Sequence, residues 1–203
     1  GHRDIGKVTL PGSADFDAEI QEYHMEGSGK NTWFDRDEFH YLYKKIKGDF
    51  ILTANVEFIG KGVDPHRKIG WMARNSLDTC SAHASAVIHG DGLTSLQYRR
   101  TEYNQTEEIR SDATRPTVVQ LERRGDVFIM SVARAGEPFL STELAGLTLN
   151  DEIYAGLFIC SHNGAVLEKA IFRNVRITLP APEGFVPYQD YIGSNLEILD
   201  VES

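Results

Sequence analysis

Short segments in which apolar residues alternate with polar ones, separated by turn signals, dominate this sequence. In the clearest segment, residues 50–59, every second residue is apolar: Phe50, Leu52, Ala54, Val56 and Phe58. A period of two is typical of a β-strand with one face against a core. No long segment has the 3.6-residue apolar period of an amphipathic helix. The chain must therefore build its core from strands.

Further strand segments follow at short intervals. We expect strands in "KIGWMAR", "AHASAVIHG", "LTSLQYRR", "QTEEIRS", "TVVQLERR", "DVFIMSVARA", "PFLSTELAGLTL", "EIYAGLFICSH" and "KAIFRNVRITL". Residues 38–47 allow a helix, but their aromatic and β-branched content and the following Gly48-Asp49 favour a strand and a hairpin. Many short strands, frequent turns and no internal repeat predict an all-β sandwich or barrel.

Length and charge limit the classes of protein to consider. The 203 residues suit one all-β domain or two small ones, and such a chain can bury a sizeable core without disulfides or structural metal ions. The formal net charge of -9 disfavours nucleic acid, because a phosphate backbone repels such a surface. No apolar run approaches the roughly 20 residues of a membrane span. Cys80 and Cys160 fit neither a zinc motif nor a disulfide framework, so we expect both thiols to be unpaired.

The two ends of the chain carry separate expectations. Residues 179–203 are rich in proline, and we expect an extended strap or linker that ends in a short strand, "LEILDV". We expect Gly1 to be a remnant of tag cleavage, so the N-terminus does not indicate a compartment.

Seven segments in a fixed order carry a family resemblance. They are "DIGKVTLPGSADFD", "GSGKNTWFDRDEFHYLYKKIKGDFILTANV", "DPHRKIGWMARNSLD", "HGDGLTSLQYRRTE", "VQLERRGDVFIMS", "AGLFICSHN" and "AIFRNVRI". Together they resemble concanavalin A-like jelly-roll domains of the lectin/glucanase superfamily. The resemblance implies a domain over residues 1–178 made of two antiparallel sheets, one of them concave, and a link to polysaccharides. It also favours a periplasmic or extracellular location.

The end of the chain carries a second resemblance. The segment "VPYQDYIGSNLEILDVES" is similar to the entry into a TolB-like β-propeller, which sometimes follows this type of domain.

Strand alternation selects candidate ligand-binding residues. In residues 82–90 the alanine series is the better core face, and in residues 93–101 Leu96 and Tyr98 are. The opposite faces then carry polar groups that meet on the concave sheet. The candidates are Lys68, Arg74, His83, His89, Gln97 and Arg99. Arg74 also resembles the arginine that sugar-active relatives carry on the equivalent strand.

These groups suit sugar hydroxyls or a uronate carboxylate. Trp33, in the "GSGKNTWFD" segment, is the candidate stacking platform at the rim. The alternative is a solvated face without a ligand, since one face of an antiparallel sheet is often polar only because water covers it. We expect Asp91, next to Gly92, to be a hairpin-turn residue and not a catalyst.

Carboxylates and histidines offer only weak catalytic or metal motifs. "EILDVE" has the wrong order for the Glu-x-Asp-x-x-Glu motif of the family 16 glucanases in this superfamily, and the adjacent Glu107 and Glu108 point to opposite faces. Three loop acids are expected caps or calcium ligands: Glu26, Asp35 and Asp37.

The histidines do not form an obvious metal motif. His83 and His89 are six residues apart on one strand, roughly 20 Å, so they cannot share an ion. His66 and His162 fall in loops that the sequence does not place relative to each other.

The leading interpretation is a lectin-like or accessory module whose partner is an oligosaccharide or polysaccharide. No cofactor other than calcium is expected. Two alternatives stay open. One is a sugar-active enzyme, either a glycoside hydrolase or a metal-dependent enzyme that cleaves 3-keto-glycosides. The other is a structural interaction domain. The sequence does not indicate an oligomeric state.

Overall fold

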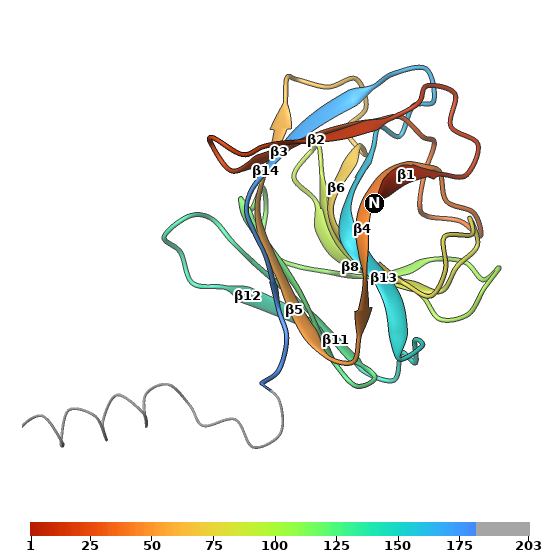
Figure 1. The fold of residues 1–203 in the computed structure, drawn as a ribbon, viewed down its shortest axis with the longest axis vertical. Helices are drawn as coiled ribbons and strands as arrows, with labels where there is room; N and C mark the ends of the chain where they lie inside the picture. Colours follow the sequence, from red (N-terminus) through yellow and green to blue (C-terminus); the bar gives the residue numbers. More distant parts are fainter. Residues whose placement is uncertain (182–203) are drawn as a thin grey trace, which may run out of the picture.

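Two antiparallel sheets of seven strands each lie face to face in the computed structural model, which describes residues 1–181 (Figure 1). The strand order in the first sheet is β1 (His2–Ile5), β4 (Phe39–Lys47), β13 (Glu152–Cys160), β6 (Lys68–Arg74), β7 (His83–His89), β8 (Thr94–Arg99) and β9 (Glu107–Arg110). The order in the second is β12 (Leu140–Leu144), β11 (Val127–Ala133), β10 (Val118–Arg124), β5 (Phe50–Ile59), β14 (Glu168–Thr178), β3 (Glu22–Gly27) and β2 (Ser13–Asp17).

The core lies between the two sheets and follows the alternation of the sequence. Leu52 and Ala54 of β5 are fully buried and face Trp71 and the alanine series of the first sheet in one apolar cluster. Burying a large apolar side chain contributes about 1.5–3 kcal/mol, so this cluster is the main source of stability. The predicted all-β sandwich is confirmed. No helix long and apolar enough to cross a membrane occurs in residues 1–181.

Most predicted strands are present, and the differences have simple causes. Residues 39–47 form β4 and continue through the turn at Gly48 into β5, so the strand interpretation holds and the helix alternative does not. The predicted segment "PFLSTELAGLTL" contains only the five-residue β12. Strands β1 to β3 were not predicted, because β1 and β2 are short, largely exposed edge strands with little apolar alternation.

The remaining predictions can be compared with the structure only where they concern residues 1–181. Cys80 and Cys160 are both buried and free, as expected. Strand β14 ends at Thr178, and the domain boundary expected after residue 178 stays a prediction. The predicted C-terminal strap and its short strand fall, from residue 182 onward, outside the described residues, as does the propeller-like segment.

The first sheet has a second apolar cluster on the face that points away from the core. We call this face the outer face; it is the one predicted to be concave. The cluster consists of Ile5, Phe39, Tyr41, Met72, Val87, Phe158 and Cys160. Two loops meet there, because the Asp37 N–H donates to the Thr79 carbonyl over 2.7 Å. As a result only part of the outer face is left for a site.

Candidate functional site

A pocket of about 240 Å³ opens on the outer face over β6, β7, β8 and β9. Its walls come from these four strands and from four of the connections between strands. The lining residues are Asn31, Trp33, His66, Lys68, His89, Leu93, Gln97, Glu108, Arg110 and His162.

Four of the predicted site residues line this pocket: Trp33, Lys68, His89 and Gln97. Lys68 of β6 is paired directly with His89 of β7, and Gln97 of β8 with Glu108 of β9. Residues that are paired across antiparallel strands point to the same face, so parity alone brings these side chains together. Their role in ligand binding remains a prediction.

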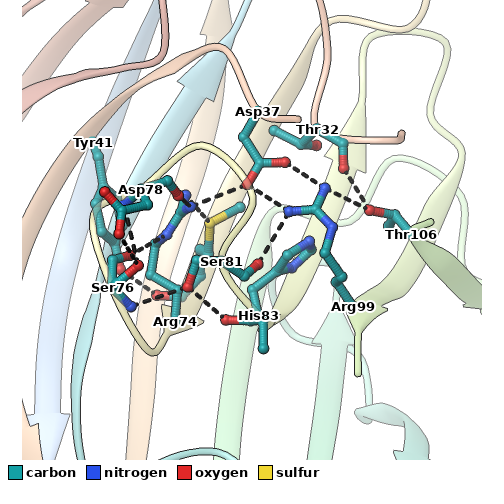
Figure 2. Close-up of polar contacts among 12 residues, drawn as sticks. Thr32, Asp37, Tyr41, Arg74, Ser76, Asp78, Ser81, His83, Arg99 and Thr106 are labelled. Atoms are coloured by element: carbon teal, nitrogen blue, oxygen red, sulfur yellow. Dashed lines mark hydrogen bonds and ion pairs between the residues drawn. The ribbon is translucent and has the colours of Figure 1, made fainter. Parts of the chain in front are cut away.

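The two predicted arginines lie elsewhere on the outer face. Arg74 and Arg99 are fully buried, with none of their surface exposed, and neither lines the pocket. Both form ion pairs with the buried Asp37, at 3.1 Å from Arg74 and 2.7 Å from Arg99 (Figure 2). The structure therefore differs from the expected open groove, because a loop carboxylate occupies the place where a ligand would meet these arginines.

Asp37 is the centre of a closed polar network. Arg99 donates to both carboxylate oxygens of Asp37, and its remaining contacts include the Ser81 carbonyl at 3.0 Å and the Thr106 hydroxyl at 3.1 Å. The Arg74 Nε donates to the Ser76 carbonyl at 2.7 Å. Burial raises the pKa of Asp37, and the two guanidinium groups oppose that rise. Backbone carbonyls thus add to the partners of two cations that share one acid, although the buried Arg99 Nε has no partner among the described residues.

His83 borders this network and not the pocket. Its Nδ1 lies 3.0 Å from the Ser85 hydroxyl, and its Nε2 has no partner among the described residues. Burial, with the charges of Arg99 and Arg74, lowers the pKa of His83 well below its ordinary value. His83 is therefore a neutral, buried residue.

Two loop histidines join the pocket, which the sequence could not foresee. The ring of His66 lies 6.2 Å from that of His89 and 5.5 Å from that of His162. The His162 Nε2 is hydrogen-bonded to the Asn31 side-chain amide at 3.1 Å, and its Nδ1 lies 3.2 Å from an Asp64 carboxylate oxygen without forming a hydrogen bond. Residues in three separate loops converge here, and no local pattern in the sequence marks that convergence.

The charged groups of the pocket have different environments. Burial lowers the pKa of Lys68, whose ammonium group donates to the Asn31 side-chain carbonyl. Burial and the nearby Lys68 charge lower the pKa of His89 to about 4. Burial would raise the pKa of Glu108, but the hydrogen bond from Arg110, at 2.6 Å, brings the net shift downward. At neutral pH the pocket thus holds a neutral His89 and an ionised Glu108.

The His89 ring has a defined role for each nitrogen. Its Nδ1 lies 3.0 Å from the Leu93 carbonyl and must be the donor, because a carbonyl only accepts. In the neutral ring Nε2 is then an acceptor, suited to a ligand hydroxyl. Asp91 accepts from the Leu93 N–H at 2.9 Å within the hairpin turn, in agreement with its predicted structural role.

The expected metal ligands and paired carboxylates can be compared with the described residues. No group of three or more histidine, cysteine, aspartate or glutamate side chains suited to a metal ion occurs within residues 1–181. Of the three expected calcium ligands, Asp37 is bound to arginines and Glu26 pairs with Lys169 at 2.6 Å. Glu108 is the one carboxylic acid among the ten residues that line the pocket.

Comparison with known proteins identifies the fold and no sequence family. No protein-family model matches the sequence, and no curated protein matches it significantly. Among solved structures, a functionally unknown protein from Saccharomyces cerevisiae is similar with a TM-score of 0.65 and 16% identity, over 89% of this chain and 97% of that one.

Two further similar structures have names that mention sugars. The carbohydrate-binding module 66 from Bacillus subtilis has a TM-score of 0.56 and 14% identity, over 88% of this chain and 96% of that one. The lectin UEA-II complexed with galactose has a TM-score of 0.53 and 8% identity, over 88% and 97%. With these neighbours and its two seven-stranded antiparallel sheets, the chain has the concanavalin A-like jelly-roll fold.

Proposed function

We propose that the pocket over β6–β9 binds a carbohydrate and that this domain is a carbohydrate-recognition module. The observation that carries the proposal is the combination of a half-buried Trp33 with directional polar groups around one small pocket. Sugar rings present apolar C–H faces and hydroxyl edges, which match an aromatic surface and fixed hydrogen-bonding groups.

Gln97 supports the proposal most directly. Its side chain is 1% exposed, its amide donates to the Ser95 hydroxyl at 3.3 Å, and its Oε1 has no partner among the described residues. A buried acceptor without a partner costs about 1–3 kcal/mol, and a hydroxyl in the pocket would recover that energy. The names of two similar folds, a carbohydrate-binding module and a lectin with galactose, are consistent with this function.

Binding is favoured over hydrolysis. Glycoside hydrolysis in its usual form needs two carboxyl groups on either side of the bond to be cleaved. Among the described residues the pocket lining has one carboxylic acid, Glu108, and it forms an ion pair with Arg110 at 2.6 Å. The polar lining also fits a sugar better than the apolar surface of a protein partner.

The test measures the binding of a panel of oligosaccharides to the wild-type chain and to Trp33→Ala. Loss of the stacking surface should weaken binding about tenfold or more, with little change in melting temperature. The matched control is Phe34→Ala, because Phe34 is the next residue, is 56% exposed and lies outside the pocket. Equal binding by wild type and Trp33→Ala, or no binding to any sugar at millimolar concentration, would reject the proposal.

A further inference from the structure

Lys68 differs from the other pocket residues because its ammonium group is buried and is not paired with a carboxylate of the described residues. The residue is 2% exposed, and the acceptor found for its ammonium group is the neutral amide oxygen of Asn31. No carboxylate lies within ion-pair distance of that group in the part of the chain that the structure describes. Buried charges in proteins are ordinarily paired, since an unpaired one loses its hydration without compensation.

The other charges of the pocket do not neutralise Lys68. Glu108 is paired with Arg110 at 2.6 Å, and His89 is neutral at pH 7. With histidines counted as neutral, the lining has one lysine and one arginine against one glutamate. The pocket is therefore positive on a chain whose formal net charge is -9.

We propose that the sugar bound in this pocket is acidic, with a carboxylate or sulfate group that pairs with the Lys68 ammonium. This inference rests on the proposed sugar-binding function and narrows it to one class of ligand. An anion would give Lys68 the partner that the protein does not supply. The Gln97 Oε1 on β8, which has no partner among the described residues, would accept a ring hydroxyl in the same pocket, so charge and hydroxyl recognition act on one molecule.

The proposal also predicts a proton linkage. Burial now lowers the pKa of Lys68, and a bound anion would raise it again. Binding should then weaken as the pH rises toward the pKa of the lysine, because the ammonium form is the one that pairs with the ligand.

The experiment uses calorimetric titration with oligosaccharides in matched pairs. One pair is trigalacturonate and its methyl ester, and the other is a sulfated galacto-oligosaccharide and its unsulfated form. The protein is tested as wild type, as Lys68→Gln and as Lys61→Gln. Lys61 is an exposed lysine outside the pocket, so its substitution makes the same change in net charge.

We expect the wild type to bind the acidic member of at least one pair more tightly than its neutral member. The pair that shows this preference identifies the recognised group as a carboxylate or a sulfate. Lys68→Gln should bind that acidic sugar about 10- to 100-fold more weakly and its neutral partner with unchanged affinity, whereas Lys61→Gln should behave as wild type. If Lys68→Gln folds poorly, the affinities of the wild-type protein for acidic and neutral sugars still test the proposal.

The experiment distinguishes a failure of the proposed charge preference from a failure of the proposed sugar binding. Equal wild-type affinity for the acidic and neutral members would overturn the inference about charge and leave sugar binding intact. The absence of binding to all four sugars, together with a negative wider panel, would overturn the proposed function and this inference with it.

Discussion

Asp37 is the residue on which the outer face of the first sheet depends. Its carboxylate binds the guanidinium groups of Arg74 and Arg99, and all three side chains are fully buried. Such an arrangement contributes less to stability than its contacts suggest, because desolvation offsets much of the attraction. Removal of one partner is different, since it leaves the others buried and unpaired.

Asp37→Asn should therefore be strongly destabilising. The substitution keeps the size of the side chain but leaves two buried guanidinium groups without a counter-charge, at a cost of about 3–5 kcal/mol. Urea denaturation followed by tryptophan fluorescence measures this change. Asp35→Asn, in the same loop and half-buried, is the control and should stay within about 0.5 kcal/mol. A loss of less than 1 kcal/mol for Asp37→Asn would mean that the network is dispensable.

At the scale of the elements, the loop from Ser28 to Glu38 joins the closed network to the pocket. Asp37 fixes one end of the loop, and the Thr106 N–H donates to the Trp33 carbonyl at 3.0 Å. The Thr106 hydroxyl also donates to the Thr32 carbonyl at 3.0 Å. The loop that presents Trp33 and Asn31 is thus held by buried polar contacts, so the pocket is largely formed before a ligand arrives.

The pocket also depends on the close pairing of β6 and β7. Gly70 of β6 has φ +148°, and a Cβ at this position would lie 1.9 Å from the Ala86 carbonyl oxygen of β7. Gly70 is paired with Val87, and the pair of Lys68 and His89 lies two residues further along both strands, so a shift of this backbone would disturb it. Gly70 is therefore required by the approach of the two strands.

Gly70→Ala should cost at least about 2 kcal/mol and weaken ligand binding, because strain and a backbone clash combine. Gly164→Ala is the matched control. Its Cβ would lie 3.3 Å from the Thr9 hydroxyl and 3.8 Å from the Lys30 side chain, at a position without positive φ, so little change is expected. Thermal denaturation of both variants makes the comparison. An unchanged melting temperature for Gly70→Ala would show that β6 and β7 separate more easily than their pairing implies.

For the whole molecule, charge is distributed unevenly between surface and interior. The chain has a formal net charge of -9, yet the buried groups on the outer face of the first sheet include Arg74, Arg99 and Lys68. Three buried histidines sit on the same sheet, His40, His83 and His89, and the pKa of each is lowered, mainly by burial. Protonation of His83 would add positive charge beside Arg99 and Arg74, and protonation of His89 would add it beside Lys68.

The protein should consequently lose stability as the pH falls from 6.5 toward 4. In this range the unfolded chain binds protons that the folded state does not, so the free energy of unfolding decreases with decreasing pH. The shift of the His89 pKa from 6.5 to about 4 corresponds to about 3 kcal/mol once the group is fully protonated.

Urea midpoints at pH 7.5, 6.0 and 5.0 test this dependence. His89→Gln should flatten this dependence in part, because it removes one of the three buried histidines. Constant stability from pH 7.5 to 5.0 would contradict the assignment of neutral buried histidines.

The sequence by itself determined the fold class and the faces of the strands. A period of two fixes which side of a strand each residue occupies, so His89 and Gln97 could be assigned to one face without a structure. Lys68 was assigned to that face by the same alternation together with the family resemblance. The hairpin at Asp91 was predictable for a similar reason, because its turn chemistry is local. Both inferences needed only residues a few positions apart.

Only the tertiary structure decided which part of that face is a site. Loop acids have no periodicity, so nothing local indicated that Asp37 would bury Arg74 and Arg99 in a closed network. The same holds for His66 and His162, which reach the pocket from loops almost 100 residues apart in the chain. Alternation determines the face on which a side chain lies, whereas long-range packing of loops determines whether that side chain meets a ligand or the protein itself.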